Sequence, residues 1–216
     1  MILSFMGPPG TGKGTVASRC VKELDYVMLS TGEVCRKHIS EQTALGKSLE
    51  QFVHKGHLIP DDLITQMVLE WLKEQAGKDV ILDGFPRTKG QADLFLQALK
   101  EEFAGETFKV INFDLSEDEI VKRISARLVC SNKECQEIYS TLVKKPAEQG
   151  ICDVCKSPVI RRKDDEASVV RERLNVFNGF KSALLDFYKS VGQEVVNFSV
   201  PEGNREVVFV AFKKLL

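Results

Sequence analysis

The stretch Gly7-Pro8-Pro9-Gly10-Thr11-Gly12-Lys13-Gly14-Thr15 decides the fold, because it connects an apolar run to a stretch with helical spacing. Ile2 to Met6 precede it, and the helical positions after it are Val16, Ala17, Cys20, Val21 and Leu24. Its glycines let backbone N–H groups converge on a phosphate, the helix start adds a positive dipole end, and Lys13 adds a point charge. The sequence therefore predicts a phosphate-binding loop for a nucleotide.

The loop departs from the strict pattern at one place. That pattern has Ser or Thr directly after the lysine, whereas here Gly14 follows Lys13 and Thr15 comes one residue later. A glycine-rich turn between a strand and a helix, without a ligand, is the alternative interpretation. The strand and helix on either side favour nucleotide binding.

A carboxylate at the end of a second apolar run supports the same interpretation. Val80-Ile81-Leu82-Asp83 reads as a strand that ends in an aspartate. Phosphate-loop proteins hold Mg²⁺ beside the β and γ phosphates with such a residue, usually through water. Many strand-terminal aspartates only cap turns, so Asp83 is a magnesium candidate because it accompanies the phosphate loop.

Short runs rich in Val, Ile and Phe alternate with helical stretches along the chain. The runs cover residues 2–6, 26–29, 80–82, 110–113 and 195–198. This alternation predicts an α/β fold with a mostly parallel sheet that is covered on both faces. Two intervals, 30–59 and 126–165, lack the alternation, and we expect them to be insertions in the core. Residues 207–216 are predicted to form a closing helix.

Composition and charge exclude several classes of protein. The chain has 216 residues, of which 43% are hydrophobic and 28% charged, as in globular proteins with a full core. Thirty Lys and Arg against 31 Asp and Glu give a net charge of −1, which argues against nucleic-acid binding. The apolar runs are too short to cross a bilayer, so we expect no membrane segment, no signal peptide and a cytoplasmic location.

Arginines are spread over several segments of the chain. They are Arg36, Arg87, Arg123, Arg127, Arg162 and Arg173. Taken singly, each is typical of a solvated or ion-paired surface residue. Guanidinium groups bind phosphate oxygens in pairs of hydrogen bonds, and phosphoryl transfer depends mainly on alignment and charge neutralisation. Together they favour a reaction between two nucleotides, and a monophosphate acceptor needs no general base because its phosphate is already anionic.

Four of the six cysteines form two close pairs. The pairs are Cys130 with Cys135 and Cys152 with Cys155, with four and two residues inside them and sixteen between them. Two thiolate pairs joined in this way can close a tetrahedral Zn²⁺ site, and disulfides are rare in a reducing compartment. We predict a structural zinc site without a catalytic role; disulfides, free thiols or bound iron are the alternatives. Cys20 and Cys35 lie in helical sequence and should be small buried side chains.

Together these motifs resemble the adenylate kinase family, in the long-lid form found in bacteria. The residues that carry the resemblance are Gly7-x-Pro9-Gly10-x-Gly12-Lys13-Gly14-Thr15, Ser30-Thr31-Gly32 with Arg36, Asp83-Gly84-Phe85-Pro86-Arg87-Thr88 with Gln91, Arg123 with Arg127, and Arg162-Lys163-Asp164-Asp165 with Arg173. The family carries the same glycine as Gly14 after the lysine. In its zinc-binding lids the first pair is commonly Cys-x-x-Cys, whereas here two further residues separate Cys130 from Cys135.

The resemblance implies a P-loop NTPase fold with a five-stranded parallel sheet and two mobile parts. The core would comprise residues 1–29, 60–125 and 166–216, the NMP-binding segment residues 30–59, and the lid residues 126–165. It implies Mg²⁺-dependent phosphoryl transfer from ATP to AMP, giving two ADP. We expect no nucleic-acid or membrane partner and a monomer.

The resemblance also implies roles for individual residues. The donor would be held by Gly10, Thr11, Gly12, Lys13, Gly14, Thr15, Arg123, Arg127, Ile138 and Tyr139. AMP would be held by Thr31, Gly32, Arg36, Leu58, Ile59, Gly84, Phe85, Arg87, Gln91, Arg162 and Arg173, with Gln91 on its base and Arg36 and Arg87 on its phosphate. Catalysis would rest on Lys13, Arg87, Arg123, Arg127, Arg162 and Arg173. Asp164 and Asp165 would anchor the closed lid to the core.

Two alternative functions stay open on the residues alone. One is a kinase for another monophosphate, such as UMP or CMP, against which Thr31 and Gln91 favour AMP. The other is a nucleotide-dependent binding module that uses the cysteine region as its interaction surface. Between the cysteine pairs, residues 136–151 hold only Lys144 and Lys145 as basic residues, which disfavours that module.

Overall fold

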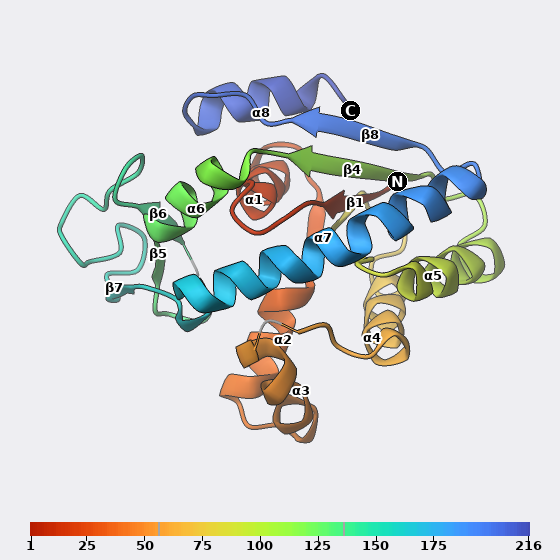
Figure 1. Cartoon of the computed structure of the whole chain (residues 1–216), viewed down its shortest axis with the longest axis horizontal. Coiled ribbons are helices and arrows are strands. Elements are labelled where there is room, and N and C mark those ends of the chain that lie inside the picture. Colours follow the sequence, from red (N-terminus) through yellow and green to blue (C-terminus); the bar gives the residue numbers. More distant parts are fainter. Residues whose placement is uncertain (56, 136) are drawn as a thin grey trace.

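The computed structural model describes residues 1–55, 57–135 and 137–216, and its core is a five-stranded parallel sheet between two layers of helices (Figure 1). The strands are β1 (Ile2–Met6), β2 (Val27–Ser30), β3 (Val80–Asp83), β4 (Phe108–Asp114) and β8 (Val195–Ser199). Their order is β2-β3-β1-β4-β8, and every neighbouring pair is parallel. The predicted P-loop fold class is confirmed, and each predicted run overlaps one of these strands.

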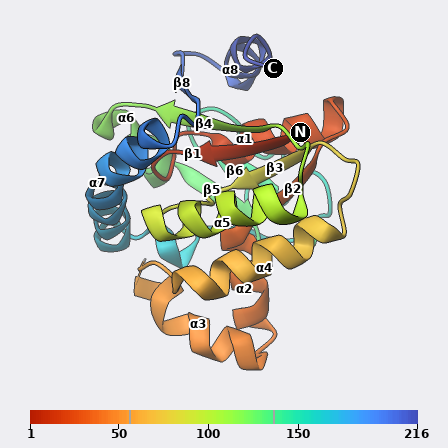
Figure 2. The ribbon, with the colours of Figure 1, turned by 90° about the vertical axis from the view of Figure 1, so that its right-hand side faces the viewer.

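Helices cover both faces of the sheet. They are α1 (Lys13–Glu23) and α8 (Arg205–Lys213) on one face, α4 (Asp61–Lys73), α5 (Lys89–Glu102) and α7 (Ala167–Ser190) on the other, and α6 (Glu117–Ser125) beside α7. Figure 2 shows α4 and α5 lying across the sheet. The closing helix, expected at 207–216, begins two residues earlier and ends at Lys213. Cys20 and Cys35 are buried in α1 and α2, as expected.

The phosphate loop passes very close to the neighbouring strand β4. Gly7 has a φ of 144°, and a Cβ added there would lie 2.6 Å from the carbonyl oxygen of Phe113. Only glycine can hold this backbone conformation without strain and also leave room for the carbonyl. This contact fixes how the loop leaves β1, and therefore where Lys13 begins α1.

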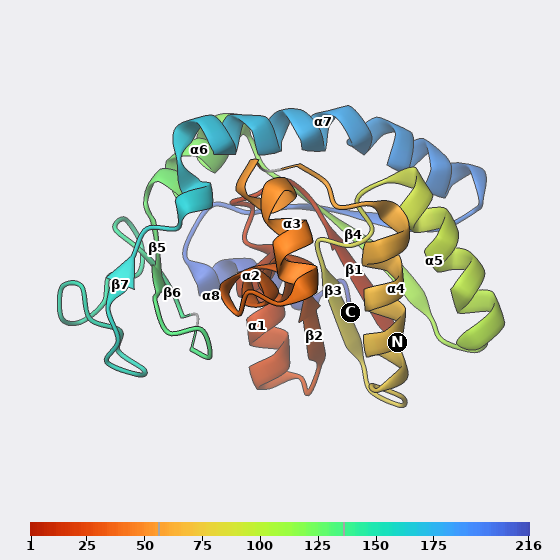
Figure 3. The same cartoon turned by 90° about the horizontal axis from the view of Figure 1, so that it is seen from below.

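The predicted NMP-binding segment contains a pair of helices, which lies in front of the sheet in the view from below (Figure 3). Its helices are α2 (Thr31–Ser40) and α3 (Ala44–Lys55), which contact each other extensively. As predicted, the described part of the segment adds no strand beyond the end of β2. Residue 56 of this segment lies outside the described residues.

The predicted lid, residues 126–165, contains a small antiparallel sheet that the sequence did not predict. Its elements are β5 (Arg127–Cys130), β6 (Ile138–Ser140), β7 (Val159–Ile160) and the short 3₁₀ helix η1 (Lys163–Asp165). The strand order is β6-β5-β7, and Figure 3 shows this sheet beside the core. Residue 136 of the lid is not among the described residues. No helix in the described ranges has the length and apolar character that a membrane crossing requires.

Candidate active site

A cavity of about 1150 Å³ lies at the carboxyl ends of the parallel strands. The phosphate loop, α2, α6, the lid and α7 all contribute to its wall. A smaller cavity of about 80 Å³ adjoins it, and the residues lining both are Gly32, Arg36, Leu58, Gly84, Arg87 and Arg173. In open α/β sheets this edge is where ligands bind. The small cavity can take only part of a nucleotide, so the shared residues mark a junction between two binding regions.

Lys13 lies over the phosphate loop. Its Nζ donates hydrogen bonds to the carbonyl oxygens of Gly7 (2.8 Å) and Pro8 (2.7 Å). Burial lowers the pKa of Lys13 to about 8; the charge of Asp83 opposes this change, and nearby arginines reinforce it. Gly10 and Gly12 have φ values of 84° and 95°, in the left-handed region that turns successive N–H groups into one concavity. The loop has the geometry of the predicted phosphate cradle.

Asp83 lies directly against the first turn of α1. A Cβ added at Gly14 would be 3.3 Å from its Oδ2, so a residue larger than glycine would crowd the carboxylate. This proximity gives a physical reason for the departure from the strict loop pattern. Because Asp83 also lines the large cavity beside Lys13, its carboxylate oxygens fit a hydrated Mg²⁺ next to the phosphates.

The structure brings five of the six arginines together at or beside the junction: three of them line both cavities, and Arg127 and Arg162 line only the large one. The five are Arg36, Arg87, Arg127, Arg162 and Arg173. Burial, followed by repulsion from Arg36 and Arg127, lowers the pKa of Arg162 to about 10. Burial likewise lowers the pKa of Arg173 to about 10, although Asp164 opposes it. Such a concentration of buried positive charge is suited to phosphate groups.

Two carboxylates of η1 partly balance these charges. Asp164 lies 3.2 Å from Nη1 of Arg173 and 3.9 Å from Nη1 of Arg36, so it stands between α7 and the NMP-binding segment. Asp165 accepts two hydrogen bonds from Arg127, one of them 2.8 Å from Nε. Burial raises the pKa of Asp164, but the surrounding arginines outweigh it and the net pKa is lowered. Both carboxylates therefore hold arginines of the site in place.

Arg123 belongs to α6 and, like Arg127 and Arg162, does not line the smaller cavity. Its Nε donates to Glu119 at 3.0 Å within α6, and the side chain lines the large cavity. The loop after β8 lines the same region through Val200, Glu202, Gly203, Asn204 and Arg205. The sequence reasoning missed this loop. Its position after the carboxyl end of a parallel strand could have identified it.

The predicted AMP residues line the smaller cavity, with two exceptions. Besides the shared residues, its wall includes Thr31, Ile59 and Gln91. Arg162 lines only the large cavity. Phe85 lines neither cavity; it is 0% exposed and packs edge-on against Phe95. The structure thus places Phe85 in the core, and its predicted contact with AMP stays a prediction.

Gln91 is held at both ends of its carboxamide. Its Nε2 donates to Oδ1 of Asp61 at 2.9 Å, and its Oε1 accepts from the backbone N–H of Arg87 at 2.7 Å. The side chain belongs to a residue that is only 3% exposed. Sequence reasoning missed Asp61, because nothing in a single sequence relates positions 61 and 91.

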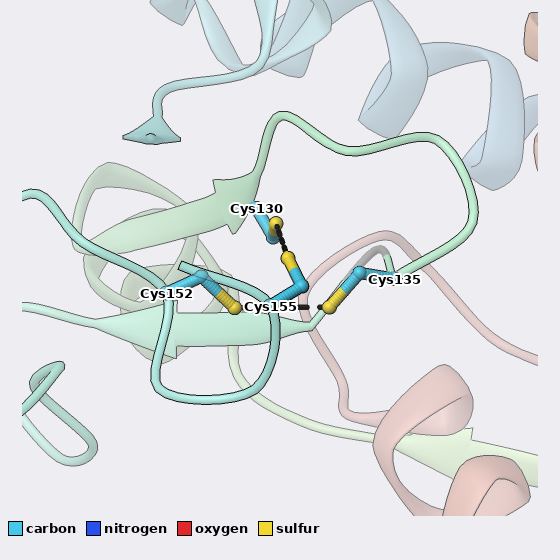
Figure 4. Close-up of side chains that lie close together, drawn as sticks. All are labelled: Cys130, Cys135, Cys152 and Cys155. Carbon is cyan, nitrogen blue, oxygen red and sulfur yellow. Dashed lines mark hydrogen bonds between the residues drawn. The ribbon is translucent and has the colours of Figure 1, made fainter. Parts of the chain in front are cut away.

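The four lid cysteines converge as predicted (Figure 4). All four Sγ atoms lie within 4.8 Å of one another, with 3.3 Å between Cys130 and Cys155 and 3.7 Å between Cys135 and Cys152. Zn–S bonds of about 2.3 Å give a tetrahedron with edges of about 3.8 Å. The four sulfurs therefore fit a closed Zn²⁺ site, and none of them forms a disulfide.

A turn accommodates the wider first spacing, and local contacts favour the thiolate form at Cys155, whereas burial raises the pKa of Cys130 and Cys135. The additional residues between Cys130 and Cys135 form a turn, in which the Cys135 N–H donates to the carbonyl of Asn132. Hydrogen bonds from Ser157 lower the pKa of Cys155 to about 6, which favours its thiolate form. Metal ligation requires that form.

Tyr139 belongs to the core of the lid. It is 0% exposed, and its hydroxyl accepts from the Asp153 N–H at 2.7 Å and lies 3.4 Å from the Cys152 Sγ. Its hydroxyl thus supports the thiol cluster, while the residue also lines the large cavity. The predicted contact between Tyr139 and the donor adenine stays a prediction.

Because the phosphate loop faces a second, arginine-lined cavity, the fold and the site define a P-loop kinase that acts on nucleoside monophosphates. A family model described as adenylate kinase matches residues 5–193. Relatives named adenylate kinase include one from Finegoldia magna, 41% identical over 87% of this chain and 86% of its own, and one from Hydrogenobaculum sp., 36% identical over the full length of both. A third, from Caldicellulosiruptor bescii, is 35% identical over 94% of this chain and 93% of its own. The chain belongs to the adenylate kinase family.

This membership confirms the predicted function, a nucleoside monophosphate kinase that uses ATP and AMP. It favours neither a kinase for UMP or CMP nor a nucleotide-dependent binding module.

Proposed function

We propose that this chain transfers the terminal phosphoryl group of ATP to AMP at the junction of the two cavities, giving two ADP. The observation that carries the proposal is that Arg36, Arg87 and Arg173 line both cavities. Phosphates that enter from the two sides meet among these guanidinium groups. There the arginines neutralise the charge of the transferring group.

The donor occupies the large cavity. Residues 10–15 hold its phosphates through backbone N–H groups and Lys13. Asp83 would hold Mg²⁺ through water, and the ion would supply positive charge that neutralises the β and γ phosphates. Arg123 lies against the donor adenine, and Arg127, Ile138 and Tyr139 complete this side from the lid.

AMP occupies the side of the smaller cavity. Arg36 and Arg87 hold its phosphate, Gln91 holds its base, Thr31 also contacts AMP, and Leu58 and Ile59 line the adenine pocket. The phosphate oxygen of AMP attacks without a general base, since it is already anionic. The protein therefore contributes alignment and charge neutralisation, which are the main requirements of phosphoryl transfer.

The NMP-binding segment (30–59) and the lid (126–165) close over the core formed by residues 1–29, 60–125 and 166–216. Closure excludes water that would otherwise hydrolyse ATP, and it brings Arg127 and Arg162 to the transferring group. The four cysteines would hold a structural Zn²⁺ that links the parts of the lid, because the small cluster around Tyr139 gives the lid little apolar core. The free thiols are consistent with a cytoplasmic enzyme, and since one chain supplies both nucleotide sites we propose that it acts as a monomer.

A coupled assay of ADP formation tests the reaction and the acceptor together. With ATP as donor, we expect rapid turnover with AMP and kcat/KM values at least about a hundredfold lower with UMP and CMP. Faster turnover with UMP or CMP would assign another acceptor. Nucleotide binding without turnover would support the binding module instead.

A further inference from the structure

Asp61, the first residue of α4, lies outside both cavities but contacts Gln91 directly. Its Oδ1 accepts the hydrogen bond from Gln91 Nε2 at 2.9 Å. Its Oδ2 lies at the start of α5, where a Cβ added at Gly90 would be only 2.4 Å away. The glycine therefore leaves the space that the carboxylate needs, and Asp61 is closely fitted between the two helices.

The partners of Gln91 allow its carboxamide only one orientation. A carboxylate accepts hydrogen bonds and does not donate, whereas the backbone N–H of Arg87 only donates. The nitrogen must therefore face Asp61 and the oxygen must face Arg87. The reversed orientation would set the Gln91 oxygen against a carboxylate and its NH₂ against an N–H. Because Gln91 is 3% exposed, water cannot readily replace the lost partners.

The fixed orientation determines which base edge Gln91 can read. A carboxamide offers two donors and two acceptor positions, of which one each is used within the protein. One donor and one acceptor remain for a ligand. A 6-aminopurine offers the complement, with N6–H as donor and N1 as acceptor. A 6-oxopurine bound in the same position has the opposite pattern, with O6 as acceptor and N1–H as donor, and would there require the reversed carboxamide.

We propose that Asp61 is a positioning residue that fixes the Gln91 carboxamide and thereby makes the acceptor site select 6-aminopurine over 6-oxopurine monophosphates. The proposal rests on the assignment of Gln91 to the acceptor base in the proposed function. It assigns selectivity to a residue that touches neither the base nor the phosphates.

Asp61→Asn tests the proposal with little change of shape. The asparagine side chain can present either its oxygen or its NH₂ to Gln91, so one of the two constraints on the carboxamide is lost. We expect the ratio of kcat/KM for AMP to kcat/KM for IMP to fall about tenfold, with kcat at saturating AMP within about twofold of the unchanged protein. IMP is the appropriate probe because its base differs from adenine only on the edge that Gln91 reads.

Asp62→Asn is the matched control, because Asp62 is the exposed neighbour in the same turn and loses the same charge. Its AMP to IMP ratio should not change. Thermal unfolding of both variants checks that the fold is retained. If Asp61→Asn lowers kcat/KM equally for AMP and IMP, Asp61 has only a structural role and the proposal is wrong.

Gln91→Ala separates this proposal from the one on which it rests. If Gln91→Ala lowers the AMP to IMP ratio and Asp61→Asn does not, Gln91 reads the base without help from Asp61, and only the further inference fails. If Gln91→Ala leaves the ratio unchanged while AMP remains the best acceptor, the base is read elsewhere. In that case the assignment of Gln91 fails, and the inference fails with it.

Discussion

Lys13 should take up a proton when ATP binds at weakly alkaline pH. Burial over the phosphate loop lowers its pKa to about 8, so the ligand-free protein carries a partly neutral Lys13 near that pH. The triphosphate favours the ammonium form, because an opposite charge at close range raises the pKa of a lysine. Binding therefore couples to proton uptake, and the effect grows as the pH rises through about 8.

The size of the effect follows from the pKa. With a value of about 8, roughly one tenth of Lys13 is neutral at pH 7, about half at pH 8 and about nine tenths at pH 9. If the bound nucleotide restores an ordinary lysine pKa, binding takes up about 0.1, 0.5 and 0.9 proton at these pH values. The same linkage weakens ATP binding about twofold at pH 8 and about tenfold at pH 9 relative to its low-pH limit.

Titration calorimetry in pairs of buffers with different ionisation enthalpies measures this uptake. Lys13→Met should remove it, whereas Lys22→Met, an exposed lysine on the same helix, should leave it unchanged. Uptake that persists in Lys13→Met, or an uptake near zero between pH 7 and 9 in the unchanged protein, would refute the reasoning. The lowered pKa of Lys13 also makes the free energy of unfolding depend on pH. Between about pH 8 and 10.5 the unfolded chain binds more protons at Lys13 than the folded chain does, so the contribution of Lys13 to stability rises with pH.

Two further predictions concern the lid. Arg162→Ala should lower kcat by two orders of magnitude or more, because the guanidinium that neutralises the transferring phosphoryl group is lost. Urea unfolding should stay cooperative, and turnover close to that of the unchanged protein would contradict the role assigned to Arg162. Elemental analysis of protein purified without added metal should find about one zinc per chain. Removing the zinc with a chelator should lower the Tm, since the lid loses the ion that holds its four thiolates. A metal-free protein whose four lid thiols titrate freely in the native state would exclude the site.

The fold of the core could be predicted because short stretches of sequence, each readable by itself, identify its strands and helices. The phosphate loop marks one strand and one helix together, and the apolar runs mark the other four parallel strands. The lid strands β5, β6 and β7 have four, three and two residues, too few to show a period of alternation. They are held by pairing around the thiol cluster, so they depend on contacts between distant parts of the segment.

The sequence allowed the charged residues of the site to be predicted, but not the side chains that hold them in position. Residue type and motif identified Arg87 and Gln91, but not the side chains that orient them. Asp61 acts on Gln91 across thirty positions of the chain, and this pairing exists only once α4 and α5 are packed together. Tyr139 gains a second role from packing: the family resemblance predicts a contact with the donor, and its hydroxyl also contacts Asp153 and Cys152 inside the lid. Tertiary packing decides both cases.

The near-zero net charge conceals a strong local excess of positive charge. The mutual repulsion and burial that lower the pKa of Arg162 and Arg173 make the arginine cluster costly to the ligand-free fold. Asp164 offsets part of this cost because it lies between Arg173 and Arg36. Its carboxylate therefore contacts guanidinium groups that can also bind phosphates. We therefore expect nucleotides to compete with an internal carboxylate for these two arginines. Such competition would lower the affinity for ATP, AMP and ADP and so favour release of products from a site that binds highly charged ligands on both sides.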